Sequence, residues 1–255
     1  MRKVADVDFG AERPGTCLVH IEVLASVADE GIETPSTETA RAGVVEDTNR
    51  WFDGERADVV DVVWAAVTTG CHGVAEQLTT DLVAARARVP ASQVRLGRLC
   101  PRCGGAQHGR PVVVSPRRTG LHLSLSRTTG IVAAAACRNH PVGVDVERVG
   151  STRFEAFAEV ALHPAESDGP PQHRARMWTR KEALLKAVGL GIAWGPERLD
   201  VGPAHQTHGR VDGLRADGLP VWWTDLELGT GYAGAVAVAA PEAPAVIARR
   251  ADAGA

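Results

Sequence analysis

In the stretch Val142-Gly-Val-Asp-Val-Glu147, valines alternate with other residues, which is the period of two expected of a strand with one buried face. Asp145 and Glu147 therefore project from the same side of this strand, about 7 Å apart. In the stretch Trp178-Thr-Arg-Lys-Glu-Ala-Leu-Leu-Lys186, positions 178, 182 and 186 form one stripe of a helix. Two carboxylates on a strand and a third on a helix can converge on one point.

Three carboxylates at one point suit Mg²⁺, which prefers oxygen ligands and takes part of its shell from water and from substrate phosphates. Lys186 lies one helical turn beyond Glu182 and would face the same negatively charged point. Each signal also has an ordinary structural explanation. An Asp-x-Glu pair is often a solvated strand face, and a Glu-x3-Lys pair is often a surface ion pair.

Lys181 has an unusual position on the same helix. It falls in the middle of an apolar arc that Met177, Leu184, Leu185 and Val188 form. A lysine in such a place must extend to solvent or find an anion.

The two stretches carry a family resemblance. Together with Leu162-His-Pro-Ala-Glu166, they resemble the signature of the 4′-phosphopantetheinyl transferase superfamily, of the long, pseudo-dimeric, surfactin-synthetase-activating type. The motif extends through Trp178-x-x-Lys181-Glu182-Ala-x-x-Lys186-Ala-x-Gly189, and the similarity runs from about residue 93 to about residue 200. The resemblance implies an α+β fold of two similar α/β subdomains related by a pseudo-two-fold axis.

The resemblance also implies an activity. A Mg²⁺-dependent enzyme of this family transfers the 4′-phosphopantetheine arm of coenzyme A to a serine of an acyl or peptidyl carrier protein, as in secondary metabolite biosynthesis, and releases adenosine 3′,5′-bisphosphate. Asp145, Glu147 and Glu182 are then expected to bind the metal. Glu182 is the expected base for the serine proton, and Lys186 is expected to stabilise charge on the phosphates. The expected contacts to coenzyme A are Arg110, Ser126, Arg127, Lys181 and Lys186.

Ser126-Arg127 departs from the family, in which this place usually reads Ser-His. Arg127 either grips a coenzyme A phosphate or ends a strand and points into water. Ser126 is either a phosphate ligand or a strand-end hydroxyl.

The segment Cys100-Pro-Arg-Cys103-Gly-Gly-Ala-Gln-His108-Gly-Arg110 has two interpretations. A Cys-x2-Cys pair with a nearby histidine is half of a zinc site, but a structural zinc takes four ligands and no second pair is visible. The alternative is a plain turn. The segment also resembles one found in many actinobacterial members of the family, in which the basic residue at position 110 helps to hold coenzyme A.

Periodicity and turn residues predict three helices, at residues 74–88 and 152–162 and in a long segment that Gly189 ends. They predict strands at residues 59–67, 94–96, 112–114, 121–125, 131–137, 142–147, 197–201, 221–226 and 232–239. We expect four parts: a poorly ordered segment (1–56), a shortened N-terminal subdomain (57–126), a C-terminal subdomain with the metal motif (127–240) and a loose tail (241–255).

The amino-acid composition and the net charge exclude some classes of function. The chain has 255 residues, 44% of them hydrophobic, and a net charge of −3, which argues against a general nucleic-acid or membrane binder. Five cysteines without an export signal predict free thiols in the cytoplasm. We expect a monomer. Two other classes remain open: a coenzyme A- or carrier-binding protein that has lost turnover, and a zinc-containing interaction module.

Overall fold

The structure, a computed structural model, describes residues 15–16, 19–20, 59–68, 71–100 and 103–253. The predicted poorly ordered segment 1–56 lies outside the described residues, except for two short strands. These are β1 (Gly15–Thr16), which pairs with β4 (Cys71–His72), and β2 (Val19–His20), which pairs with β14 (Asp252–Ala253).

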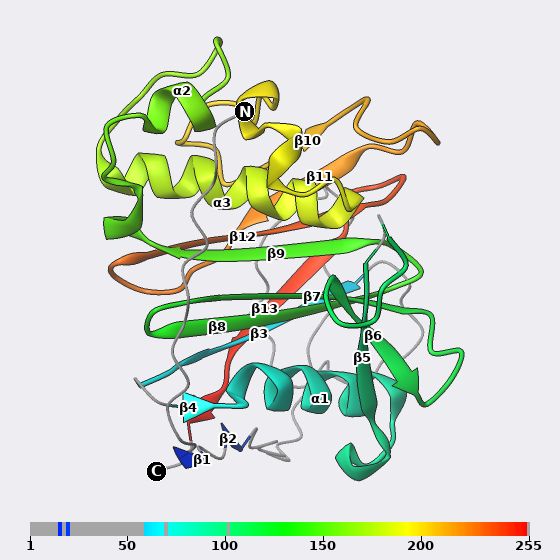
Figure 1. The fold of residues 1–255 in the computed structure, drawn as a ribbon. Coiled ribbons are helices and arrows are strands. Elements are labelled where there is room, and N and C mark those ends of the chain that lie inside the picture. The colour runs from blue at the N-terminus through cyan, green and yellow to red at the C-terminus, as the bar shows by residue number, and fades with distance from the viewer. Residues whose placement is uncertain (1–14, 17–18, 21–58, 69–70, 101–102, 254–255) are drawn as a thin grey trace, which may run out of the picture.

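The first four-stranded sheet has the order β13-β3-β8-β7. Its strands are β3 (Val59–Ala66), β7 (Leu121–Thr128), β8 (Ile131–Arg138) and β13 (Ala245–Arg250). Neighbours are antiparallel except β13, which runs parallel to β3. Helix α1 (Val74–Ala87) covers the outer face of this sheet (Figure 1), and its buried leucines pack on the alanines of β8.

The second four-stranded sheet has the order β10-β11-β12-β9 and is antiparallel throughout. Its strands are β9 (Val142–Arg148), β10 (His208–Val211), β11 (Val221–Asp225) and β12 (Tyr232–Ala239). The long helix α3 (Pro171–Val188) lies across its outer face, with the short helix α2 (Phe157–Ala161) beyond it (Figure 1).

The two sheets lie between the helices, so the layers run α1, first sheet, second sheet, α3 (Figure 1). The core between the sheets consists of β-branched and small side chains, which fit a pleated surface. Val144 and Val146 of β9 point into this core, as their alternation predicts. The α+β class is thus confirmed, whereas the pseudo-two-fold relation stays a prediction.

A separate hairpin stands beside α1 (Figure 1). It consists of β5 (Arg95–Leu99) and β6 (Arg110–Ser115), and its loop carries the cysteine-rich segment. Four 3₁₀ turns complete the described elements: η1 (Ala91–Gln93), η2 (Val149–Thr152), η3 (Ile192–Trp194) and η4 (Pro196–Arg198).

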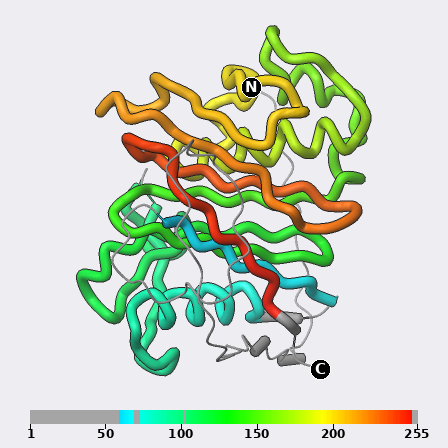
Figure 2. The backbone as a smooth tube through the Cα atoms, turned by 180° about the vertical axis from the view of Figure 1, so that it is seen from behind, coloured from blue at the N-terminus to red at the C-terminus, as the bar shows by residue number. Residues whose placement is uncertain are grey.

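The predicted loose tail is wrong, because residues 245–250 form strand β13 beside β3 (Figure 2). Val246 and Ala251 are buried there, and this apolar burial holds the segment in place. The predicted subdomain boundary at 126/127 falls inside β7, and β8 pairs with β3 and β7 in the first sheet. A division into two subdomains stays a prediction.

Two predicted elements also differ from the structure. Residues 152–162 form no continuous helix: Thr152 ends the turn η2, and the short helix α2 covers only Phe157–Ala161. The Thr152 hydroxyl lies 3.0 Å from the Val149 carbonyl oxygen and 3.2 Å from that of Pro171, and it caps no helix. The strand predicted at 197–201 is replaced by η4, which is closed by a hydrogen bond from the Leu199 amide to the Pro196 carbonyl. The long helix is confirmed, with Gly189 in the left-handed conformation at its C-terminus.

Candidate active site

The two sheets meet along the edge strands β7 and β9. Ser124, Ser126 and Thr128 alternate along β7 and face β9. The Val144 amide donates to Ser124 Oγ at 2.9 Å, and the Val146 amide donates to Ser126 Oγ at 3.3 Å. Since β12 pairs with the other edge of β9, these hydroxyls satisfy amides that would otherwise be buried without a partner.

Asp145 is the buried centre of this contact. Its Oδ1 accepts a hydrogen bond from Ser126 Oγ at 2.8 Å and lies 2.6 Å from Lys186 Nζ. Burial raises the pKa of Asp145, while the ion pair with Lys186 and the bond from Ser126 lower it and the nearby Glu147 raises it further. A buried carboxylate of this kind needs a cation, and Lys186 supplies one.

Glu147 and Glu182 complete a group of three carboxylates. Glu147 Oε1 accepts hydrogen bonds from Thr128 Oγ1 and from the Arg148 amide, both at 2.8 Å. Burial raises the pKa of Glu182 from 4.5 to about 7, and the charges of Asp145 and Glu147 add to that rise against the opposing effect of Lys186. The raised pKa thus comes first from burial and then from the neighbouring like charges.

Helix α3 comes very close to β9 because position 143 is glycine. A Cβ there would lie 2.0 Å from the Ala183 carbonyl oxygen and 2.5 Å from the Ala187 amide nitrogen. This close approach lets Lys186 reach across β9, where its Nζ also donates to the Val144 carbonyl at 3.1 Å and to Ser126 Oγ at 3.2 Å. The glycine therefore sets the distance between the helix and strand residues of the site.

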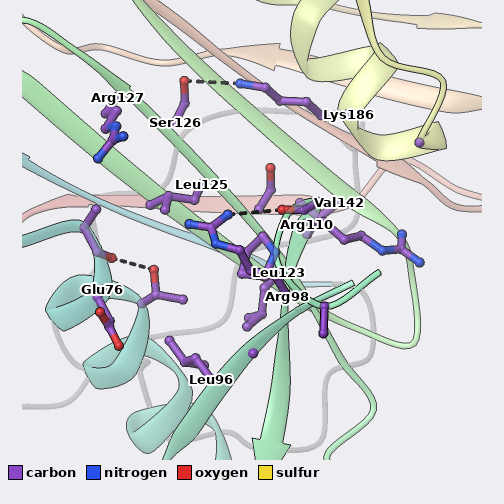
Figure 3. Close-up of a pocket in the computed structure, with 18 of the residues that line it drawn as sticks. Glu76, Leu96, Arg98, Arg110, Leu123, Leu125, Ser126, Arg127, Val142 and Lys186 are labelled. Carbon is purple, nitrogen blue, oxygen red and sulfur yellow. Dashed lines mark hydrogen bonds between the residues drawn. The ribbon is translucent and has the colours of Figure 1, made fainter. Parts of the chain in front are cut away.

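A cavity of about 800 Å³ opens beside these groups. Its walls come from the start of α1, the β5–β6 hairpin, β7 and the C-terminal end of α3 (Figure 3). Ser126 and Lys186 lie on its wall and contact Asp145, whereas none of the three carboxylates lines this cavity.

The cavity wall is rich in cations. Arg98, Arg110 and Arg127 line it with Lys186, against one carboxylate, Glu76. Arg127 is exposed and lies on the α1 side of β7, turned away from Lys186 (Figure 3). The Arg98 guanidinium donates to the Gly109 carbonyl at 3.1 Å, which ties the hairpin strand to its loop. Such a wall suits an anionic ligand with several phosphates.

A comparison with protein families gives a match in the C-terminal part of the chain. Residues 141–237 match the family described as the 4′-phosphopantetheinyl transferase superfamily. They form a domain of that superfamily. A search of curated proteins found no match. No helix among the described residues has the length and apolar character that a membrane crossing requires.

The superfamily domain contains β9 and α3, and with them Asp145, Glu147, Glu182 and Lys186. Glu182 interacts electrostatically with the other three, and Lys186 pairs with Asp145, but among the described residues the ligand atoms of the three carboxylates do not all lie within 4.8 Å of one another. Arg110, Ser126 and Arg127 lie N-terminal to the matched residues, on the cavity wall. The roles of all seven residues remain predictions.

The predicted phosphate contact of Lys181 is wrong. Its side chain is fully buried within the superfamily domain, where Nζ donates to the Ala161 carbonyl at 2.6 Å and pairs with Glu166 at 2.5 Å. Lys181 has thus found an anion, as its place in an apolar arc requires, but the anion belongs to the protein. Glu166 also accepts from the amides of His163 and Val201, so it holds a turn, and it is not one of the residues that line the 800 Å³ cavity.

Sequence reasoning missed three contributors to the site. Ser124 and Thr128 could have been found from their alternation with Ser126 in Leu123-Ser-Leu-Ser-Arg-Thr128. The role of Gly143 in helix packing carries no local signal because the contact joins residues far apart in the chain.

Proposed function

We propose that this protein transfers the 4′-phosphopantetheine arm of coenzyme A to a serine hydroxyl of an acyl or peptidyl carrier domain and releases adenosine 3′,5′-bisphosphate. The observation that carries the proposal is the juxtaposition of Asp145, Glu147, Glu182 and Lys186 beside a cation-lined cavity, within a domain of the matching superfamily. We assign the chain to the long, pseudo-dimeric type and expect it to act as a monomer, which light scattering of the purified protein tests.

Coenzyme A would occupy the cavity. Arg110 and Arg127 are exposed on its wall and present planar guanidinium groups that suit pairs of phosphate oxygens. The Ser126 hydroxyl donates to Asp145 and accepts from Lys186. A phosphate that contacts Ser126 would therefore also contact Lys186. These contacts would position the pyrophosphate at the end of the cavity where the carboxylates begin.

Asp145, Glu147 and Glu182 would hold Mg²⁺. Their donor chemistry fits a hard cation. Burial, and then the charges of Asp145 and Glu147, raise the pKa of Glu182 to about 7, and a bound cation would offset both effects. As described, Asp145 and Glu147 are turned to hydroxyl and lysine partners rather than to one common point. When bound, Mg²⁺ would neutralise charge on the pyrophosphate.

The chain's own residues would then move the proton and stabilise the leaving group. Glu182 is the candidate base for the carrier serine, because it is a carboxylate held one helical turn from Lys186 at this site. Lys186 Nζ, on the cavity wall, would stabilise the charge on the leaving adenosine bisphosphate. In-line attack requires the serine hydroxyl to be held close to the β-phosphate and opposite the leaving oxygen.

The direct test uses the purified full chain, an apo carrier domain and coenzyme A, with and without Mg²⁺. Intact mass spectrometry should reveal one phosphopantetheinyl group on the carrier, and alanine at the acceptor serine should abolish it. Coenzyme A binding by calorimetry without any mass gain, across acyl and peptidyl carriers, would identify a binding protein without turnover instead.

A further inference from the structure

The loop between β5 and β6 brings Cys100, Cys103 and His108 together. Each of the three offers one ligand atom, a sulfur or a ring nitrogen, and these atoms all lie within 4.8 Å of one another. No other such group of His, Cys, Asp or Glu is found among the residues that the structure describes. Cys100 is buried, whereas Cys103 and His108 are exposed. The sequence alone left a zinc site and a plain turn open, and the fold supplies the proximity of His108 to both sulfurs.

The distance between the Cys103 and His108 ligand atoms is that expected at a tetrahedral metal. Zn–S and Zn–N bonds of about 2.3 and 2.05 Å place sulfur and nitrogen ligands about 3.5 Å apart at a tetrahedral centre. Cys103 Sγ lies 3.4 Å from His108 Nε2. We propose that Cys100, Cys103 and His108 bind a zinc ion, with water or another small ligand in the fourth position.

The backbone of the loop supports this geometry. The Gly104 amide donates to the Cys100 carbonyl and the Cys100 amide donates to the Gly105 carbonyl, both at 2.9 Å, so the two cysteines are held in one tight turn. The Gly105 amide donates to Cys103 Sγ at 3.4 Å, and a donor at this position favours the thiolate that binds metal.

Glycine is required at the base of the loop. Gly109 has φ +100, and a Cβ there would lie 2.4 Å from the Leu99 carbonyl oxygen and 2.5 Å from the Cys100 amide nitrogen. This close approach returns the chain past Cys100 directly after His108. Gly105 likewise leaves room for the ligands, because a Cβ there would meet Cys103 Sγ at 3.2 Å.

Zinc binding would fix one wall of the large cavity. Gln107 and Gly109 of the same loop line the cavity, as does Arg110 at the start of β6. Binding requires each thiol to release its proton to solvent and His108 to be neutral, so the affinity should increase with pH. Since two thiolates and an imidazole select zinc over Mg²⁺, this site is chemically distinct from the carboxylates on β9 and α3.

The test uses the full chain in a non-chelating reductant. Zinc is titrated against a chromophoric chelator, and Co²⁺ replaces it to report sulfur coordination through thiolate-to-metal charge-transfer absorption. We expect one zinc per chain. Cys103→Ser and His108→Gln, both at exposed positions, should weaken binding by at least about tenfold, because even outer-shell changes cost that much. The matched controls are Cys137→Ala in β8 and His205→Gln in a remote exposed loop, and both should bind as the parent does.

Three outcomes would overturn the proposal. They are no zinc bound by the parent, equal binding by Cys103→Ser and the parent, and cobalt spectra without sulfur coordination. The 3.4 Å contact would then be a sulfur–histidine hydrogen bond within a turn. None of these measurements involves coenzyme A or a carrier, so the result is independent of the proposed transferase activity.

Discussion

Lys186 Nζ on helix α3 lies 2.6 Å from Asp145 Oδ1 on strand β9, and this ion pair joins the helix to the seam between the two sheets. The lysine side chain is 30% exposed and the aspartate 8%, so the pair is reached from the cavity side through the lysine. The pair places a cation between the carboxylates and any phosphate in the cavity.

The substitution Asp145→Asn removes the negative charge of the side chain and keeps its shape. The amide oxygen can still accept from Ser126 and Lys186, so the free energy of unfolding should change by less than about 2 kcal/mol. Phosphopantetheinyl transfer should fall at least about hundredfold, because a metal carboxylate is lost. Urea unfolding and carrier mass spectrometry measure the two effects, with Asp212→Asn as an exposed control. Normal transfer at saturating Mg²⁺ would contradict the metal assignment.

Glu182→Gln should change how stability depends on pH. The pKa of Glu182 is about 7 in the folded protein and near 4.5 when unfolded, so between these values the folded state holds the extra proton. The parent therefore loses stability as pH rises from about 4.5 to 7, by roughly 2 kcal/mol for a partly exposed group. The glutamine variant lacks this loss.

Urea unfolding in a metal chelator at pH 5 and pH 8 tests this difference. Relative to the parent, Glu182→Gln should gain stability at pH 8 and not at pH 5, while Glu159→Gln, at an exposed position, should gain nothing. A parent-to-variant difference that is the same at both pH values would show that Glu182 titrates normally.

Gly143→Ala should push helix α3 away from strand β9. The added methyl group meets backbone atoms of the helix at 2.0 and 2.5 Å, so the whole helix must move. We expect a loss of about 3 kcal/mol in the free energy of unfolding, together with weaker transfer. Gly150→Ala, where a Cβ meets nothing within 4 Å, is the matched control. Equal stability of the two variants would refute the close-packing argument.

Arg180→Lys tests a buried pair within the superfamily domain. Arg180 is fully buried, holds both carboxylate oxygens of Asp225 at 2.8 and 2.7 Å, and stacks on Trp223 with its Cζ 4.2 Å from the ring centroid. A lysine lacks the planar fork, so we expect a loss of about 3 kcal/mol. Thermal unfolding measures this loss, with Arg153→Lys at an exposed position as the control. Equal melting temperatures of the two variants would show that the planar guanidinium of Arg180 does not stabilise the fold.

Arg127→His should make coenzyme A binding depend on pH. Arginine stays cationic, whereas histidine loses its charge near pH 6.5, so the variant alone should lose affinity between pH 6 and pH 8. The loss of one charge-assisted hydrogen bond corresponds to about 1.5 to 3 kcal/mol. Calorimetry at three pH values, with Arg153→His as the control, measures it. Identical pH-independent affinities of Arg127→His and the parent would leave Arg127 without a phosphate contact.

Local patterns were enough to predict the elements that carry the site. The valine alternation at 142–147 and the spacing of Glu182 and Lys186 each follow from the geometry of a single strand or helix, and both were confirmed. The apolar arc around Lys181 also predicted that this lysine is buried and needs an anion. The resemblance at the family level agrees with the superfamily domain at residues 141–237.

The tertiary structure alone decided which partner each group meets. The sequence around Lys181 does not indicate that its anion is Glu166 rather than a phosphate. The sequence of the last residues does not indicate that β13 pairs with β3. Likewise, His108 reaches the two cysteines only through a loop that glycines allow to close. A local pattern sets which face of an element is buried, whereas the identity of the neighbour depends on packing between residues far apart in the chain.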